Sequence, residues 1–243
     1  MPVALVTGAN SGIGYAIAGR LLRDGYSLGF ASNERGEEER AAFTRLSALG
    51  PAHWVCGDLA DPDVPARLVA EAVAALGGVD VLVNNAGLSV AKPALELTAE
   101  DVDLTFAVDV RAPLLLSQAF ARAASPGGVV VNVTSIHETV PRPGFVVYAA
   151  AKAALGMLTR GLALELAPLG LRVVAVAPGA ISTSRNEEAE ALSAEVPLGR
   201  PGTPEEVAAL VAFLVSDEAR YITGVSYLID GGAAQQVITR PAG

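Results

Sequence analysis

The sequence predicts an α/β fold: one domain built on a doubly wound parallel sheet of about seven strands. Short β-branched runs alternate with longer Ala- and Leu-rich stretches along the 243 residues, the pattern of repeated strand–helix–strand units. Several runs, such as DVLVN and GGVVVNV, are almost continuously apolar, as expected of strands buried on both faces. No linker-like stretch and no internal repeat interrupts the pattern, so a single domain over residues 1–243 is expected.

Each element follows from a local pattern. Strands are expected at Val3–Thr7, Ser27–Ala31, His53–Cys56, Val79–Val83, Val129–Val133, Arg172–Ala177 and Val225–Ile229. Helices are expected at Ile13–Arg23, Glu37–Ala48, Asp63–Ala75, Ala99–Ala124, Val147–Leu166 and Pro204–Leu214, with a break inside the long fourth one left open. Thr203 before Pro204 is typical of a helix start, with Thr as N-cap and Pro in the first turn.

Composition excludes several classes of protein. The chain is 51% hydrophobic and 18% charged, which is typical of globular proteins rather than disordered ones. The formal net charge of −9 argues against nucleic acid and anionic membranes as partners. We see no apolar run of the ~18 residues that a span needs, and MPVALVTGAN lacks the features of a signal peptide, so a cytoplasmic protein is expected. Cys56 is the only cysteine, and no Cys/His cluster suggests a metal site.

A glycine-rich turn, TGANSGIG, follows the first strand and opens the first helix at residues 7–14. Glycines let the backbone approach a ligand closely, and a helix N-terminus offers N–H groups and partial positive charge to a pyrophosphate. The spacing is G-x-x-x-G-x-G, and a turn without a ligand is the alternative. The strand-to-helix position favours a dinucleotide site. The candidate cofactor-binding residues here are Gly8, Asn10, Ser11, Gly12, Ile13 and Gly14.

The second strand bears on the choice between NADP and NAD. In an NAD site an acidic residue usually stands at the end of this strand and binds the ribose hydroxyls. Here that position falls on Ser32, whose neutral side chain would not repel a 2′-phosphate. Arg35 is a candidate to pair with the phosphate, or else a solvated side chain; Glu34 would hold a ribose if the strand ran longer. The pattern favours NADP, with NAD the alternative. Further candidates are Asn33, Asp58, as an acceptor for the adenine amino group or as a helix N-cap, and Leu59.

Residues 148–152 read YAAAK. In a helix, Tyr148 and Lys152 lie one above the other on one face. They are either an exposed helix pair or an acid with a tuning cation. Hydride transfer to a ketone leaves negative charge on oxygen, so a proton must arrive and a donor must hold the oxygen. A phenol beside an ammonium group can deliver that proton, and Ser135, at the end of the VVVNVTS strand, can hold the oxygen.

Together these motifs resemble the short-chain dehydrogenase/reductases of about 250 residues. The likeness covers nearly the whole chain through TGANSGIG, the NNAG stretch at 84–87, Ser135, YAAAK and Pro178-Gly179. SIHETVPRPGFVVYAAAK is similar to bacterial glucose 1-dehydrogenases and their polyol-oxidising relatives. The resemblance implies a Rossmann fold, a nicotinamide cofactor, a homotetramer, and interconversion of a secondary alcohol and a ketone. It implies Tyr148 as acid/base, Lys152 as its partner and a ribose ligand, and Ser135 on the substrate oxygen. Beside the cofactor it implies Asn85, Ala86, Gly87, Pro178, Gly179, Ile181 and Thr183.

One residue departs from the family pattern. The helix after NNAG usually carries an Asn that helps to relay protons, and here FAVDVRAP places Asp109 there. Its backbone carbonyl can still hold a water, but an ionised carboxylate cannot donate. Asp109 is therefore expected near the site, with the relay in question.

Two other functions compete with a sugar, polyol or small-carbonyl oxidoreductase. A 3-oxoacyl thioester reductase would need a basic docking face for an acidic carrier, and the chain is acidic. A non-catalytic NAD(P) sensor would not need Ser135, Tyr148 and Lys152 together. His137 and Glu138 are either polyol contacts or loop residues. Ser182–Leu198 is expected to be a mobile lid, and the tail Gly231–Gly243 either reaches a neighbouring subunit or is disordered.

Overall fold

The computed structural model describes residues 1–183 and 190–235. Within them the strands are β1 (Val3–Thr7), β2 (Ser27–Ser32), β3 (Ala52–Cys56), β4 (Val81–Asn84), β5 (Val129–Val133), β6 (Arg172–Pro178) and β7 (Ser226–Ile229). The α-helices are α1 (Gly12–Arg23), α2 (Glu37–Ser47), α3 (Val64–Leu76), α4 (Ala99–Phe106), α5 (Ala112–Ala123), α6 (Val146–Leu166) and α7 (Pro204–Val215).

The strands form one seven-stranded sheet with the order β3-β2-β1-β4-β5-β6-β7, and every neighbouring pair is parallel. The chain leaves β1 toward β3 and then returns to place β4 on the other side of β1. Open α/β sheets bind ligands at this switch point, outside the carboxyl ends of the strands. The predicted α/β fold with a doubly wound parallel sheet is confirmed.

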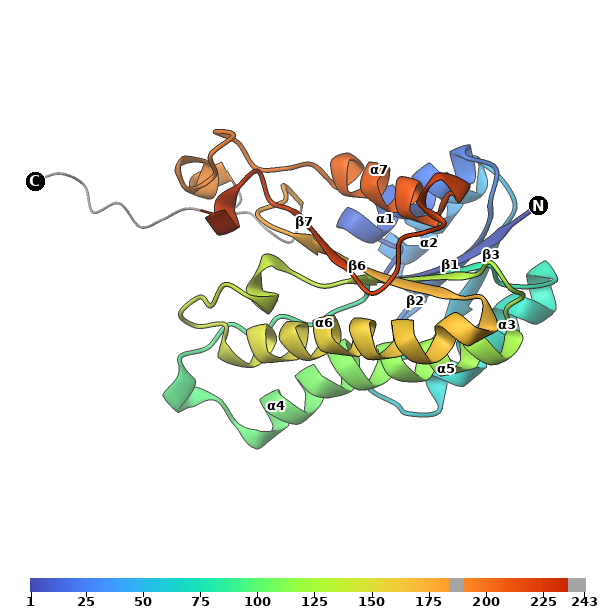
Figure 1. The fold of residues 1–243 in the computed structure, drawn as a ribbon. Helices are drawn as coiled ribbons and strands as arrows, with labels where there is room; N and C mark the ends of the chain where they lie inside the picture. The colour runs from blue at the N-terminus through green and yellow to red at the C-terminus, as the bar shows by residue number, and fades with distance from the viewer. Residues whose placement is uncertain (184–189, 236–243) are drawn as a thin grey trace, which may run out of the picture.

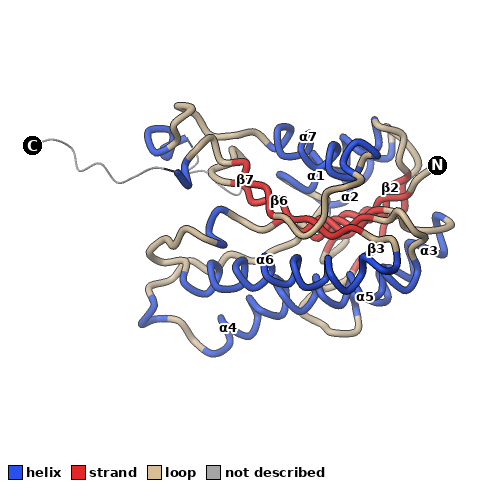
Figure 2. The backbone as a smooth tube through the Cα atoms, in the orientation of Figure 1, coloured by secondary structure: helices blue, strands red, loops and turns tan. Residues whose placement is uncertain are grey.

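Helices cover both faces of the sheet. In Figure 1, α1, α2 and α7 lie on one side, and α3, α4, α5 and α6 lie on the other; Figure 2 shows the sheet as the middle layer. Each side has its own apolar core. One core packs Ile17 and Leu21 of α1 against Val207 and Val211 of α7, and the other contains Phe120 of α5. Because β1, β4, β5 and β6 are covered on both faces, their strands are buried and read as continuous apolar runs.

The predicted long helix over residues 99–124 is interrupted. Between α4 and α5 lies a π-helical turn, Ala107–Arg111, and Pro113 stands in the first turn of α5. A proline has no N–H, so Pro113 cannot donate to the carbonyl of Asp109, as residue i+4 of an α-helix would. The wider turn is the local response to that missing bond, and it places Asp109 inside the molecule, where it is 0% exposed.

Of the other predicted bounds, only the start of β4 differs by more than one residue. β4 begins at Val81 rather than Val79, because Asp80 ties the chain down just before the strand: its N–H donates to the Val3 carbonyl and its carboxylate accepts from the Val3 N–H. β2 ends at Ser32 and does not run on to Glu34.

Among the described residues, one helical stretch, Ala99–Ala123, has the length and apolar composition of a membrane span. Core helices of globular folds pass the same test. Here α5 packs against α3 and β4, and α4 packs against α6, so the stretch forms part of the layer below the sheet in Figure 1.

Candidate active site

A buried polar chain holds the sheet and α6 together next to the switch point. Asn84, the last residue of β4, donates through Nδ2 to Asn132 Oδ1 of β5 at 2.8 Å. Asn132 Nδ2 in turn donates to Thr159 Oγ1 of α6, also at 2.8 Å. All three residues are at most 2% exposed, where hydrogen bonds have no competition from water. This chain fixes α6 relative to the carboxyl ends of β4 and β5.

The glycine-rich turn forms a tight cradle between β1 and α1. Gly8 and Gly12 have φ values of 62° and 53°, which side chains disfavour. A Cβ at Gly14 would lie 2.2 Å from the Gly8 carbonyl oxygen. Ser11, the N-cap of α1, makes no side-chain capping bond, so among the described residues the first N–H groups of the helix face the pocket without a cap from Ser11. Such a helix start suits a pyrophosphate.

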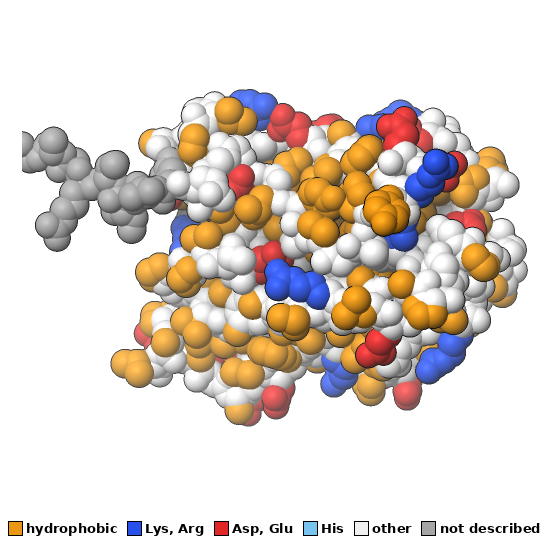
Figure 3. All heavy atoms as spheres, viewed as in Figure 1, with side chains coloured by type: hydrophobic (Ala, Val, Ile, Leu, Met, Phe, Trp, Pro, Cys, Tyr) orange, Lys and Arg blue, Asp and Glu red, His pale blue; other side chains and the backbone are white. Residues whose placement is uncertain are grey.

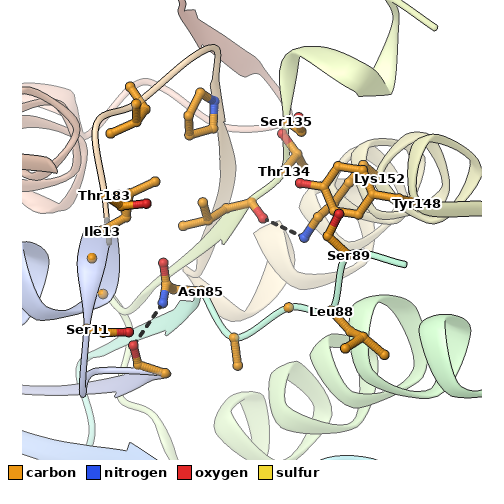
Figure 4. A pocket seen from close by; sticks show the side chains of 18 of the residues that line it. Ser11, Ile13, Asn85, Leu88, Ser89, Thr134, Ser135, Tyr148, Lys152 and Thr183 are labelled. Atoms are coloured by element: carbon orange, nitrogen blue, oxygen red, sulfur yellow. Dashed lines mark hydrogen bonds between the residues drawn. The ribbon is translucent and has the colours of Figure 1, made fainter. Parts of the chain in front are cut away.

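Thr7 joins this cradle to the loop after β4. Its hydroxyl oxygen accepts from the Asn85 and Ala86 N–H groups, both at 3.0 Å, and its proton goes to the Val83 carbonyl at 3.2 Å. The Asn85 amide donates to the carbonyls of Thr7 and Gly8, at 2.9 and 3.2 Å. Asn85 therefore shapes the cradle, and its amide points at the glycine turn in Figure 4. Sequence reasoning did not single out Thr7, although it opens the TGANSGIG motif.

One pocket brings the glycine turn and the predicted catalytic residues together. Its lining includes Gly8, Ser11, Gly12, Ile13, Gly14, Asn85, Ala86, Gly87, Ser135, Tyr148, Lys152, Pro178, Gly179, Ile181 and Thr183. Leu88, Ser89, Val133 and Thr134 also line it and were not predicted. In Figure 4 the side chains of Ser135, Tyr148 and Lys152 lie together on one side of this pocket, opposite Thr183 and the start of α1.

Tyr148 and Lys152 lie on one face of α6, as their spacing predicts. The ammonium nitrogen is 5.5 Å from the centre of the Tyr148 ring and donates to the Val133 carbonyl at 3.3 Å. The side chain of Lys152 is only 4% exposed. Ser135 follows β5, and its hydroxyl oxygen accepts from the His137 N–H at 3.2 Å. Because that bond uses the oxygen, the hydroxyl proton remains available to a ligand in the pocket.

Asp109 lies behind Lys152. Its Oδ1 accepts from the Leu88 N–H at 2.8 Å, and its Oδ2 is 3.6 Å from Lys152 Nζ. Burial raises the pKa of the Asp109 carboxyl, while the charge of Lys152 opposes the rise. Asp109, which the sequence predicts to lie near the site, therefore lies in it, and its carboxylate forms an ion pair with the Lys152 ammonium group.

His137 and Phe145 form an aromatic wall beside Tyr148. The His137 ring stacks on Phe145 at 5.8 Å and meets the Tyr148 ring edge-on at 6.2 Å. Its Nδ1 is 2.8 Å from the Val140 carbonyl, which requires a proton on Nδ1. His137 is therefore partly buried rather than a fully solvated loop residue.

A second hollow continues the cleft toward β2. The two share Gly8, Ala86, Gly87 and Leu88, and the second adds, among others, Asn10, Ser32, Asn33, Asp58 and Leu59. All five were predicted to bind the cofactor, Asn10 as part of the glycine-rich turn and the other four beyond it. Asp58 does not cap α3, whose N-cap is Asp63; it accepts from the Ala60 N–H in a local turn.

The structure places the remaining residues of the adenosine end in fixed contacts. Ser32 donates to the Glu34 carbonyl at 2.6 Å and accepts from Trp54 Nε1 at 2.8 Å. Arg35 lies outside the lining: it donates to the Trp54 carbonyl at 3.2 Å, and its guanidinium carbon is 5.3 Å from the Trp54 ring centre. Asn10 donates to the buried carboxylate of Glu39 at 3.0 Å.

The predicted lid and tail are described only in part. Residues 184–189 and 236–243 lie outside the described chain. Glu190–Glu195 forms a 3₁₀ turn, as does Ala233–Gln235.

Comparison with known proteins identifies the family. A family model described as "Enoyl-(Acyl carrier protein) reductase" matches residues 8–234. A "Glucose 1-dehydrogenase" of Gluconobacter oxydans is 38% identical over 242 residues, which cover 94% of this chain and 90% of that protein. The chain belongs to the short-chain dehydrogenase/reductase family.

Other short-chain dehydrogenase/reductases agree. A "3beta-hydroxysteroid dehydrogenase 1" of Eggerthella lenta is 41% identical and covers 94% of this chain and 92% of its own. A solved short chain dehydrogenase of Burkholderia cenocepacia, in complex with NADP, has 41% identity and a TM-score of 0.91, covering 96% of this chain and 97% of its own. The protein is therefore an NAD(P)-dependent oxidoreductase that interconverts an alcohol and a ketone.

Proposed function

We propose that Tyr148 is the acid/base of this reaction and that the substrate is a sugar, a polyol or another small polar alcohol. The observation that carries the proposal is the shared pocket: Tyr148, Lys152 and Ser135 line the same cavity as the glycine turn. A nucleotide sensor would have no use for a phenol, an ammonium group and a hydroxyl gathered beside its cofactor.

The residues present fit a nicotinamide dinucleotide. Three glycines of the cradle have no room for a side chain: a Cβ at Gly8, Gly14 or Gly87 would come within 3.1 Å of a neighbouring protein atom. The start of α1 would hold the pyrophosphate, Asn33 and Asp58 the adenosine, and Thr183 the nicotinamide end. When bound, the nicotinamide supplies or accepts the hydride.

The chain's own residues handle the proton and the oxygen. Ser135 donates to the substrate oxygen, which gathers negative charge as a ketone is reduced. The Tyr148 hydroxyl gives its proton to that oxygen during reduction and takes it back during oxidation. Lys152, 5.5 Å from the ring centre, favours the phenolate electrostatically and reaches the pocket to hold the nicotinamide ribose.

We infer a preference for NADP from the end of β2. Ser32, the final residue of that strand, is neutral, whereas a carboxylate there would repel a 2′-phosphate. A ratio of kcat/KM for NADPH over NADH above one supports this inference, and a ratio below one contradicts it.

The substrate class follows from polar groups at the mouth of the pocket. Ser89, Thr134 and Ser135 line it. His137 lies beside Tyr148, and its neutral ring, with Nδ1 donating to the Val140 carbonyl, would present Nε2 as an acceptor. Hydroxyl-rich substrates can satisfy such groups, whereas a long acyl chain cannot. A panel of sugars, polyols, simple ketones and a 3-oxoacyl thioester, each run with NADPH and NADH, separates these substrates; preferred turnover of the thioester would favour the acyl reductase.

The decisive variant is Tyr148→Phe, which removes one hydroxyl and keeps the ring. We expect kcat to fall by at least about 100-fold, while the NADPH dissociation constant, measured by fluorescence titration, changes little. Ser135→Ala is the companion variant, with retained NADPH binding and a fall in kcat of about 100-fold or more. Full activity of purified Tyr148→Phe protein would remove the assigned acid.

We also propose a homotetramer. Hydrophobic side chains are exposed on two separate parts of the surface: Met157 and Leu164 on α6 are 61% and 79% exposed, and Phe213 of α7 and Leu228 of β7 are 41% and 43% exposed. Figure 3 shows hydrophobic side chains spread over the face that carries α6 and β7. Two self-complementary surfaces would give a tetramer with three two-fold axes. A light-scattering mass of one or two subunits would contradict this.

We expect this enzyme in the cytoplasm, in keeping with its acidic composition and the packing of Ala99–Ala123 into the helix layer. Cell fractionation that recovers it with membranes would contradict that location.

A further inference from the structure

Asp109 and Lys152 form an ion pair that is almost wholly withdrawn from solvent. Asp109 Oδ2 is 3.6 Å from Lys152 Nζ, and the two side chains are 0% and 4% exposed. A buried charge without a partner is strongly destabilising, so each group serves as the counter-charge of the other.

The pair is held against the loop after β4. Asp109 Oδ1 is bound by the Leu88 N–H at 2.8 Å, while Oδ2 has no hydrogen-bond donor within the described residues. A Cβ at Gly87 would lie 3.1 Å from Lys152 Nζ and 3.2 Å from Asp109 Oδ1. The loop therefore packs its backbone directly onto both charged groups, and the carboxylate cannot move without disturbing it.

We propose that Asp109 is a positioning residue for Lys152, whose carboxylate fixes the ammonium group beside Tyr148 and partly cancels its field at the phenol. This inference rests on the roles proposed above for Tyr148 and Lys152. A single cation stabilises a phenolate strongly, whereas a cation paired with an anion acts as a dipole, and its field falls off more steeply. Asp109 thus places the working range for alcohol oxidation at higher pH than Lys152 alone would.

Apart from Glu138 and Arg142, the other ionisable groups on elements packed around the pair are held elsewhere or lie in solvent. His137 is held by Val140, Asp101 pairs with Lys92, and Arg111 donates to Ala60. Glu100, Asp103, Arg122, Arg160 and Glu165 are exposed, where water and salt screen their charges. Arg142 lies over the Phe145 ring, and Glu138 Oε2 is buried without a hydrogen-bond partner in the described chain. Both stay unchanged when Asp109 is substituted, and the carboxylate that contacts Lys152 is that of Asp109.

The pH sense of the effect follows from Asp109 itself. Burial raises the pKa of its carboxyl, with Lys152 and the Leu88 N–H opposing the rise. Above that pKa the carboxylate is charged and cancels part of the ammonium field; below it, the neutral acid does not. Neutralising Asp109 should therefore change the oxidation rate most in the alkaline range, where alcohol oxidation is measured.

The test is Asp109→Asn, which keeps an oxygen to accept from the Leu88 N–H. The ultraviolet absorbance of the phenolate is titrated against pH in cofactor-free protein, and the same titration with Tyr148→Phe isolates the signal of Tyr148. We expect the midpoint to fall by about 1 pH unit in Asp109→Asn, and the acid limb of the oxidation rate to move down with it. Asp103→Asn, on exposed α4, is the matched control and should shift neither.

An unchanged or higher midpoint in Asp109→Asn would overturn the proposal. Asp109→Ser supplies a second neutral side chain at the same place, and a lowered midpoint in it supports the proposal in the same way. Loss of the folded state in both variants would count against the proposal, since the carboxylate would then serve the fold rather than the phenol. Retained turnover in Tyr148→Phe would instead refute the proposed acid, a separate outcome.

Discussion

The substitution Gly14→Ala would place a methyl group in the tightest contact of the nucleotide cradle. The new Cβ would lie 2.2 Å from the Gly8 carbonyl oxygen and 2.3 Å from Asn85 Nδ2. Neither atom can rotate away cheaply, because one is backbone and the other is bound to the carbonyls of Thr7 and Gly8. The cradle has to open by close to an ångström for the variant to fold.

The expected cost follows from these contacts. Displacing the Asn85 amide breaks two hydrogen bonds worth about 1 kcal/mol each, and the overpacked methyl adds about 1–3 kcal/mol. We therefore expect the free energy of unfolding to fall by about 3–5 kcal/mol. The same opening separates the N–H groups of α1 from the position of a pyrophosphate, so NADPH binding should weaken as well.

Urea unfolding, followed by the fluorescence of the single tryptophan, Trp54, measures the stability; fluorescence titration measures NADPH binding. Gly78→Ala is the matched control, because Gly78 stands outside the helices, has no positive φ, and would have no described atom within 4 Å of its added Cβ. It should stabilise the protein by about 0.4–1 kcal/mol. A Gly14→Ala protein within about 1 kcal/mol of the parent and with unchanged NADPH affinity would refute the steric reasoning.

Substitutions at three further residues test other parts of the structure. Thr7→Val leaves two partly buried N–H groups without their acceptor and should cost about 2–4 kcal/mol in urea unfolding. Thr7→Ser should restore most of this, and equal stability of the Val and Ser variants would contradict the reasoning. Arg35→Ala should raise the KM for NADPH by less than about threefold, since the guanidinium lies on Trp54; a tenfold rise would place it on the cofactor. Arg200 lowers the pKa of Glu206 from 4.5 to about 2, so this pair stabilises above the unfolded pKa and loses its effect as pH falls toward 2. Glu206→Gln should reduce the loss of stability at low pH by less than about 1 kcal/mol, because the pair is exposed. A pH profile of stability identical to that of the parent would contradict the assignment.

The local patterns of the chain were enough to predict its layers and the position of the site. Buried parallel strands and amphipathic helices differ in period, so the alternation along the sequence indicated the fold before any contact was known. The i, i+4 spacing in YAAAK required Tyr148 and Lys152 to share a face of α6. The glycine pattern required a cradle at the end of β1, and the φ values of Gly8 and Gly12 show why glycine stands there.

Tertiary structure decided which partner each polar group takes. Thr7 bonds to the loop after β4, more than 70 residues along the chain, and Arg35 turns to Trp54 on the neighbouring strand. Asp109 lies in the π turn next to Pro113, and its carboxylate meets Lys152 of α6, which is far away in the sequence. The periodicity of a sequence indicates which face of an element is buried, but it does not indicate which residue of another element packs against that face. That information arises when the sheet order brings β1, β4 and β5 side by side and encloses their ends in a low-dielectric interior, where each buried charge and donor must find a partner.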